Sequence, residues 1–238
     1  MVFVDLAAQQ EKIRPLIEAN IQAVLKHGRY IMGPEVKQLE GQLSEFAGVK
    51  HCISCSSGTD ALIMALMACG IGPGDAVFTS PFTFVASAEA VRLVGAVPVF
   101  VDIDPDTFNI SVEKLETAVR EFKKGPQAGL VPRAIIPVDL FGLPCDYDRI
   151  NRVAKDNGLV VIEDAAQSFG AEYKGRMAGG LGDIGCTSFF PAKPLGCYGD
   201  GGAVFTNSDE MAETLVSIYD GVRLRLRVTG YCGYWGIK

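Results

Sequence analysis

The chain has 238 residues, of which 48% are hydrophobic and 21% charged, so it can bury a large core and is neither disordered nor collagen-like. Its net charge of −6 disfavours nucleic acid and anionic membranes as partners, and no stretch has the length and apolarity of a membrane helix or signal peptide. Seven cysteines scattered through apolar segments predict reduced thiols. We therefore expect a soluble, cytoplasmic protein.

Two helices with a bend at Gly33-Pro34 are expected over residues 5–47. From about residue 50, short apolar runs alternate with helical stretches. The predicted strands are 51–55, 76–79, 97–102, 134–139, 159–163, 186–190 and 202–206, and the predicted helices are 58–69, 84–94, 111–123, 146–156 and one from about 208. This alternation predicts an α/β fold, in which helices sandwich a mostly parallel sheet.

The charge balance changes abruptly near the end of the sequence. Residues 221–238 carry a charge of +4 and no acid, whereas residues 1–220 carry −10. We expect a domain boundary there, with one unit over 1–217 and a divergent basic tail over 218–238. The alternative is a basic edge strand, because Val222, Leu224, Leu226 and Val228 alternate with arginines.

Ser56 to Asp60 form the first candidate binding segment. The segment follows a predicted strand and begins a predicted helix, so its free backbone amides would face outward and could bind a phosphate. The simpler alternative is that Ser57 or Thr59 only caps the helix.

Asp164 comes directly after the apolar run 159–162, at the expected carboxyl end of a strand, and Gln167 follows one turn later. In open α/β sheets, ligands bind beyond the carboxyl ends of the strands. An acid that ends a buried strand needs a charge partner. That partner could be an arginine or lysine of the protein, or the protonated ring nitrogen of a bound heterocycle.

Lys193 lies in a proline-framed apolar segment, Phe190-Pro191-Ala192-Lys193-Pro194, after a predicted strand. A lysine amine in such surroundings can form an imine with a carbonyl compound. The alternative is a surface loop that only connects two strands.

Three other patterns do not support a site. Residues 180–185 fit G-x-G-x-x-G, but a strand rather than a helix is expected after them, which argues against a dinucleotide site. Cys52 and Cys55 fit C-x-x-C, yet on a strand they would face opposite sides. With only two histidines in the chain, we expect neither a metal site nor a Ser-His-Asp triad.

Taken in order, the motifs are more specific than any of them alone. The Ser-Gly-Thr turn precedes Pro-Phe-Thr-Phe-Val-Ala-Ser at 81–87, Glu-Asp-Ala-Ala-Gln at 163–167 and Ser-Phe-Phe-Pro-Ala-Lys-Pro-Leu-Gly at 188–196. This order resembles the DegT/DnrJ/EryC1/StrS family of pyridoxal 5'-phosphate (PLP)-dependent nucleotide-sugar aminotransferases. The resemblance runs from Val4 to about Ser217 and implies the large domain of the aspartate aminotransferase-like fold.

The resemblance also implies roles for particular residues. Lys193 would hold PLP as an imine, Asp164 would pair with the pyridinium nitrogen, and Gln167 would lie against other ring substituents. Phe84 would stack on the ring, and the phosphate would be held by Gly58, Thr59 and Ser188. The expected reaction moves an amino group from glutamate to a nucleotide-linked ketosugar in a homodimer.

The opening of the sequence looks most like the branch that aminates UDP-linked 3-keto uronic acids for surface polysaccharide. The dTDP-linked 3- and 4-ketosugars are alternative substrates. A non-catalytic PLP-fold protein and an α/β phosphosugar-binding module are alternative functions. After about Ile218 the sequence departs from the family, so we expect the small C-terminal domain to be missing and the chain to be a poor or inactive catalyst.

Overall fold

The computed structural model describes residues 5–125, 127 and 129–228, apart from the side chains of residues 220–228. The described chain begins with helices α1 (Leu6–His27) and α2 (Pro34–Ala47). The main sheet contains strands β1 (His51–Cys55), β2 (Asp75–Thr79), β3 (Val97–Phe100), β4 (Val131–Ile136), β5 (Val160–Asp164), β8 (Ile184–Ser188) and β9 (Gly202–Thr206). The helices between and after the strands are α3 (Gly58–Ala68), α4 (Ala86–Leu93), α5 (Val112–Glu121), α6 (Tyr147–Asn157) and α7 (Asp209–Val228).

The seven strands are ordered β1-β9-β8-β5-β4-β2-β3. Strands β3, β2, β4, β5 and β8 pair in parallel, whereas β9 runs antiparallel to both of its neighbours. The expected α/β class with a mostly parallel sheet is therefore confirmed. Parallel strands bring their carboxyl ends to one edge of the sheet, and this edge is where the candidate residues after β5 and β8 lie.

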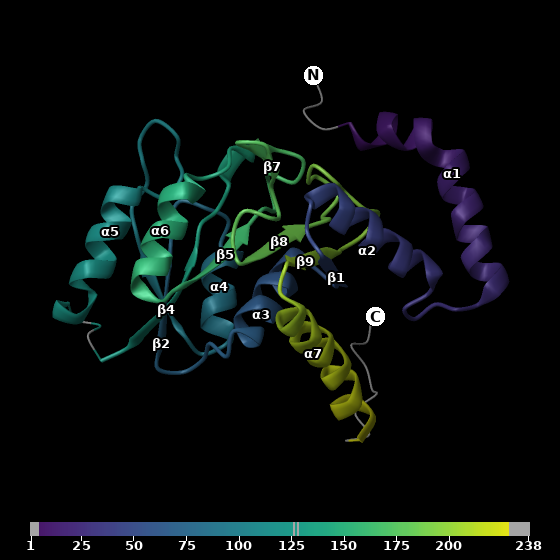
Figure 1. Cartoon of the computed structure of the whole chain (residues 1–238). Coiled ribbons are helices and arrows are strands. Elements are labelled where there is room, and N and C mark those ends of the chain that lie inside the picture. Colours follow the sequence, from purple (N-terminus) through teal and green to yellow (C-terminus); the bar gives the residue numbers. More distant parts are fainter. Residues whose placement is uncertain (1–4, 126, 128, 229–238) are drawn as a thin grey trace.

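Helices cover both faces of the sheet, because successive residues of each strand point to opposite sides. Val77 and Ile162 pack against α3, α4 and α7 in one core cluster, and Phe78 and Val161 pack against α5 and α6 in another. A third, smaller cluster joins α2 to β1 and β9. These layers surround the sheet in Figure 1.

Helix α1 has a different environment. None of its residues is buried, and the helix projects to one side of the sheet in Figure 1. Its apolar side chains are correspondingly open, with Leu16 70% exposed, Ile21 52% and Leu25 55%. No described helix is long and apolar enough to cross a membrane.

Several expected boundaries were displaced. The strand predicted over 134–139 is β4, which begins at Val131 and ends at Ile136, and the strand predicted over 186–190 is β8, which ends at Ser188. Two short strands, β6 (Glu172–Tyr173) and β7 (Arg176–Met177), were not foreseen. Each contains only two residues, which are too few to show the alternation of apolar and polar residues that predicts a strand.

Helix α7 contradicts the alternative interpretation of the basic tail. The helix continues to Val228, so residues 222–228 are helical and do not form an edge strand. Leucine and arginine both have high helix propensity, and this propensity outweighs the alternation of apolar and basic residues that suggested a strand. The expected boundary at 217/218 falls within this helix, and Ile218 and Tyr219 pack against the first core cluster. The remaining tail residues, 229–238, lie outside the described residues.

Candidate active site

One cavity of about 440 Å³ lies at the carboxyl edge of the sheet. It is formed by the residues that follow β1, β5 and β8, together with the segment before α4. All seven candidate binding residues line it: Gly58, Thr59, Phe84, Asp164, Gln167, Ser188 and Lys193. Residues separated by up to 135 positions in the sequence therefore share one cavity, as expected for ligand binding at this edge of an open α/β sheet.

Asp164 is the last residue of β5, and its side chain forms a buried wall of the cavity. Ser87 Oγ donates a hydrogen bond of 2.8 Å to its Oδ2, and the Ala166 amide donates one of 3.2 Å to its Oδ1. Burial raises the pKa of Asp164, while these two bonds and the positive charge of Lys193 oppose the rise. A buried carboxylate in this position is stabilised further by a cation placed in the cavity.

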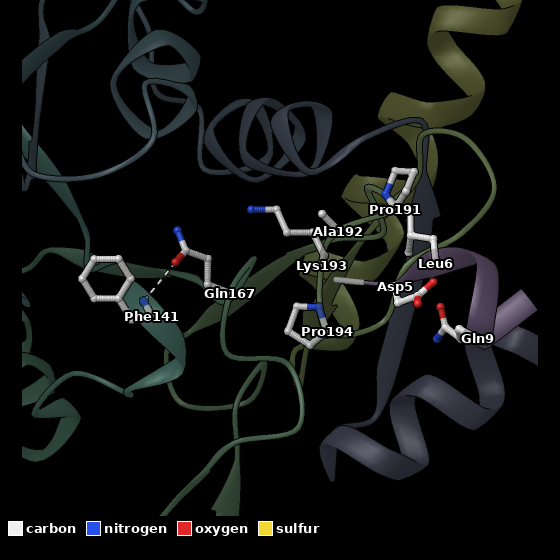
Figure 2. Close-up of a pocket in the computed structure, with 9 residues that line it drawn as sticks. All are labelled: Asp5, Leu6, Gln9, Phe141, Gln167, Pro191, Ala192, Lys193 and Pro194. Carbon is white, nitrogen blue, oxygen red and sulfur yellow. Dashed lines mark hydrogen bonds between the residues drawn. The ribbon is translucent and has the colours of Figure 1, made fainter. Parts of the chain in front are cut away.

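Gln167 is oriented by the backbone of a neighbouring turn. Its Oε1 accepts a 2.9 Å hydrogen bond from the Phe141 amide, which Figure 2 shows as a dashed line. Because the oxygen of the amide is engaged, its nitrogen is left to donate on the other side. Phe141 holds this position with a φ of 57°, a left-handed conformation that is uncommon for a residue other than glycine.

The first turn of α3 fits tightly against the end of β8. Ser57 caps the helix, since its side chain accepts a hydrogen bond from the Asp60 amide at 3.0 Å, as the simpler interpretation expected. Capping does not exclude a binding role, because Gly58 and Thr59 also line the cavity. A Cβ on Gly58 would lie 2.6 Å from Ser188 Cβ, so only glycine allows this approach. The close approach places a helix N-terminus beside a serine hydroxyl, an arrangement suited to an anion.

Phe84 and Lys193 complete the cavity from its open side. Phe84 precedes α4 instead of beginning it, and 66% of its surface is exposed, so its ring can take a ligand. Lys193 lies in a turn beyond β8 and is half-buried, between the exposed Ala192 and Pro194. Its segment is therefore more exposed than its apolar composition suggested. Figure 2 shows the Lys193 side chain extending into the space on the side of Gln167.

The loop that carries Lys193 connects β8 to β9 and is closed at its base. The Phe189 amide donates to the Gly201 carbonyl at 2.7 Å, and the Cys197 amide donates to the Phe189 carbonyl at 2.8 Å. Within the loop, Gly196 packs so closely on Pro191 that a Cβ would lie 2.3 Å from its carbonyl oxygen. These contacts fix the path of the loop although much of its surface is exposed.

Sequence reasoning did not assign three residues that the structure places at the cavity. Ser87 donates to Asp164, Asp200 lines the wall, and Thr83 presents a buried Oγ1 that has no hydrogen-bond partner among the described residues. Ser87 and Thr83 both belong to the 81–87 motif, so the motif did point to this part of the cavity. The pairing of Ser87 with Asp164 could not be read from the sequence, because the two residues lie more than 70 positions apart.

The rejected motifs have structural explanations. In the 180–185 glycine pattern, Leu181 donates its amide to the buried Glu163 carboxylate, as does Gly179 just before the pattern. Cys52 and Cys55 pack into core clusters on opposite faces of the sheet. Among the described residues, no group of three or more histidine, cysteine or acidic side chains is arranged to hold a metal ion.

PLP has three features that a binding site must match: a phosphate, a ring nitrogen that can be protonated, and an aldehyde. The cavity offers an anion site at α3 and Ser188, a buried carboxylate at Asp164 and an amine at Lys193. The unpartnered Thr83 Oγ1 adds a polar atom that a ligand would satisfy. The residues therefore fit PLP.

Comparisons with known proteins agree with this fit. A profile of the DegT/DnrJ/EryC1/StrS aminotransferase family matches residues 11–231. The UDP-2-acetamido-2-deoxy-3-oxo-D-glucuronate aminotransferase of Pseudomonas aeruginosa is 55% identical over 216 residues, which are 91% of this chain and 58% of that protein.

Solved structures lead to the same family. A DegT DnrJ EryC1 StrS aminotransferase from Brucella abortus matches with a TM-score of 0.88 and 56% identity over 92% of this chain and 58% of that one. NtdA from Bacillus subtilis, with bound cofactor PMP, matches with a TM-score of 0.80 and 33% identity over 91% of this chain and 47% of that one. The chain thus spans about half the length of these relatives, from 47% to 58%. It belongs to the DegT/DnrJ/EryC1/StrS aminotransferase family.

Proposed function

We propose that the protein is a PLP-dependent aminotransferase that moves an amino group from glutamate to a nucleotide-linked ketosugar. The main support is the single cavity that joins the α3 anion site, the buried Asp164 and the Lys193 amine. Similarity to the P. aeruginosa enzyme favours UDP-2-acetamido-2-deoxy-3-oxo-glucuronate as the acceptor, for surface polysaccharide biosynthesis.

When bound, PLP supplies an electron sink that stabilises negative charge at the amino-bearing carbon. The residues of the chain hold and orient this group. Gly58, Thr59 and Ser188 would bind the phosphate, and Phe84 would cover the ring. Asp164 would stabilise a proton on the ring nitrogen, since an ionised carboxylate beside that atom favours its charged form.

Lys193 has two tasks in this mechanism. Its Nζ would hold the cofactor through the aldehyde. When free, the Lys193 amine would accept and return a proton at Nζ, as a general base and acid. Gln167, whose Oε1 accepts from the Phe141 amide, would offer its amide nitrogen to a substituent of the ring.

Chemical trapping tests the assignment of Lys193. The full chain is mixed with PLP, reduced with borohydride, digested and mapped. We expect visible absorbance before reduction and a pyridoxyl adduct on Lys193. Lys174 and Lys155 serve as internal controls, because neither lines the cavity. An adduct spread over these lysines would refute the role of Lys193, and absence of any absorbance change would favour a phosphosugar-binding module.

Substrate assays separate catalysis from binding alone. Glutamate should bleach the PLP absorbance, and the ketosugar should then restore it while gaining an amine. A protein that binds PLP but fails in both steps is a non-catalytic member of the family. UDP-linked 3-keto uronic acid should react faster than dTDP-linked 3- or 4-ketosugars, and the reverse order would overturn the proposed acceptor.

The proposed assembly is a cytoplasmic homodimer. The exposed apolar side chains of α1 support association, because surfaces of this kind usually contact a partner. Six free cysteines in the described residues fit a reducing compartment. We propose that residues 1–217 form the N-terminal segment and cofactor-binding domain, and that 218–238 form a divergent segment that begins within α7. Light scattering after gel filtration tests the dimer, and a monomeric mass at micromolar concentration would refute it.

A further inference from the structure

Asp139 is a buried acid that the proposed mechanism does not use. It follows β4, is fully buried and does not line the cofactor cavity. Burying an ionised carboxylate costs free energy unless its oxygens accept hydrogen bonds. Burial accordingly raises the pKa of Asp139 to about 6, and the hydrogen bonds that the carboxylate accepts oppose the rise. These hydrogen bonds show which parts of the structure the carboxylate holds together.

Three donors from two segments of the chain meet at the Asp139 carboxylate. The Cys145 amide donates to Oδ1 at 3.0 Å, and the Tyr147 hydroxyl donates to the same oxygen at 2.9 Å. The Ser168 hydroxyl donates to Oδ2 at 2.9 Å. One carboxylate oxygen therefore binds the segment that leads into α6, and the other binds the turn that follows β5.

The two segments that Asp139 joins also meet at Gln167. Asp139 begins the turn whose Phe141 amide donates to Gln167 Oε1 at 2.9 Å, the bond drawn in Figure 2. Ser168 is the residue after Gln167, and its amide donates to the Ala165 carbonyl at 3.1 Å, which closes the turn that carries Gln167. The bond between Ser168 and Asp139 is thus a second link between the same two turns, made by two buried residues.

The backbone around Asp139 is held on both sides. The Asp139 amide donates to the Asp164 carbonyl at 3.2 Å, and the Asp164 amide donates to the Pro137 carbonyl at 2.9 Å. On the other side, Asn109 Oδ1 accepts a hydrogen bond of 3.2 Å from the Leu140 amide. The start of the turn is therefore fixed to the end of β5 and to the segment before α5, so the carboxylate is a stationary point to which a neighbouring turn can be attached.

We propose that Asp139 is a positioning residue for Gln167. Its carboxylate joins the turn that supplies the Phe141 amide to the turn that carries Gln167, and the link through Ser168 sets the direction in which the Gln167 amide faces the cofactor cavity. The inference rests on the proposed function where it concerns PLP, and on the contacts of the chain alone where it concerns Gln167. Tyr147 makes no such link, because its hydroxyl joins Asp139 to the first residue of α6.

Two substitutions separate positioning from general support of the fold. Ser168→Ala and Tyr147→Phe each remove one hydroxyl donor from the buried Asp139 carboxylate, so each should lower the melting temperature of the chain. Only Ser168→Ala breaks the link to the turn that carries Gln167. Tyr147→Phe is therefore the matched control for a loss of stability without a loss of positioning.

Hydrogen exchange of the Phe141 amide, followed by NMR in the full chain without PLP, is the first measurement. Ser168→Ala should raise the exchange rate about five-fold, the effect of one hydrogen bond, toward the rate in Gln167→Ala, which lacks the acceptor of this amide. Tyr147→Phe should leave the rate unchanged. Ser168→Cys, which has a similar volume and a weaker donor, should shift the rate in the same direction and replaces Ser168→Ala if the alanine variant does not fold. An unchanged rate in the Ser168 variants, or an equal rise in Tyr147→Phe, would overturn the proposal.

Titration with PLP, followed by absorbance, is the second measurement. Ser168→Ala should weaken PLP binding about five-fold in the unmodified chain and should have no further effect in a Gln167→Ala background, because positioning acts through Gln167. A five-fold loss in both backgrounds would overturn the proposal. If the unmodified chain did not bind PLP, the proposed function would be refuted, and exchange of the Phe141 amide would still decide whether Asp139 positions Gln167.

Discussion

Replacing Gly58 with alanine tests whether the anion site depends on the close approach of α3 to β8. The new Cβ would lie 2.6 Å from Ser188 Cβ and 3.2 Å from Ser188 Cα, whereas carbon atoms normally pack about 3.5–4.0 Å apart. Backbone must move by almost 1 Å to accommodate it. Movement is resisted because Ser188 pairs with Gly202 in the sheet, and Gly202 itself packs against the Ser57 carbonyl.

The cost of this overpacking is about 1–3 kcal/mol. The better helix propensity of alanine offsets at most about 1 kcal/mol of it. We therefore expect Gly58→Ala to lower the free energy of unfolding by about 1–2 kcal/mol, which corresponds to a melting temperature lower by about 2–8 °C. Displacement of Ser188 from the helix also weakens the phosphate site, so PLP affinity should fall while the affinity for pyridoxal, which lacks the phosphate, should not.

Gly41→Ala is the control for this experiment. Gly41 lies within α2, and a Cβ there meets no atom within 4 Å, so alanine should stabilise the protein by about 0.5–1 kcal/mol and leave PLP binding unchanged. Thermal unfolding and a PLP titration measure both effects. If Gly58→Ala matched Gly41→Ala in stability and PLP affinity, the argument from close packing would be refuted.

Three further substitutions address buried groups at or behind the cavity. Asp164→Asn should keep the fold and slow the glutamate half-reaction, because an amide cannot stabilise a protonated ring nitrogen; an unchanged rate would leave Asp164 a strand-end acid only. Ser87→Ala removes a hydrogen bond that lowers the pKa of Asp164, so the acidic limb of the half-reaction's pH profile should move to higher pH, and an unmoved limb would contradict this role. Tyr147→Phe removes the hydroxyl that donates to Asp139 at 2.9 Å, where burial raises the pKa of the carboxyl from 3.8 to about 6. Because the folded pKa is the higher one, stability from the protonated Asp139 is complete below about pH 4 and is lost as the pH rises through 6. At pH 7.5 Asp139 is ionised and depends most on the Tyr147 hydroxyl, whereas at pH 5 it is largely protonated. The variant should therefore lose about 1–3 kcal/mol of unfolding free energy at pH 7.5 and less at pH 5. Equal losses at the two pH values would contradict this explanation.

The sequence predicted the fold well where strands are apolar throughout. The run Leu159 to Ile162 leads into the buried strand β5, which begins at Val160, and its unbroken apolar character and length identify it directly. Strand β4 was harder, because Val131-Pro132-Arg133 reads as a loop, while Pro137 and Val138 continue the apolar run beyond the last residue of the strand. Pairing with β2, which has an irregular register at this point, defines where β4 begins. Such pairing is a property of two segments and is not visible in one.

The candidate site was predictable where residues follow strand ends or belong to a motif. Asp164, Gln167 and Lys193 met both conditions. The Phe141 amide, which orients Gln167, was not predictable, because any residue type can donate a backbone hydrogen bond. Ser87 was quoted in a motif but received no role, since its contact with Asp164 requires α4 and β5 to be placed side by side.

Because the loop between β8 and β9 is closed at its base, the candidate site is built from two separate parts of the structure: the sheet with α3, and this loop. The proposed contacts with the phosphate and ring depend on the sheet and α3, whereas Lys193 lies on a loop whose base is closed by the backbone hydrogen bonds of Phe189 with Gly201 and Cys197. Lys193 itself is half-buried and fills no part of the core clusters. A different side chain at position 193 can therefore be accommodated without repacking, so the scaffold allows the chemistry to change while the binding of the cofactor is retained.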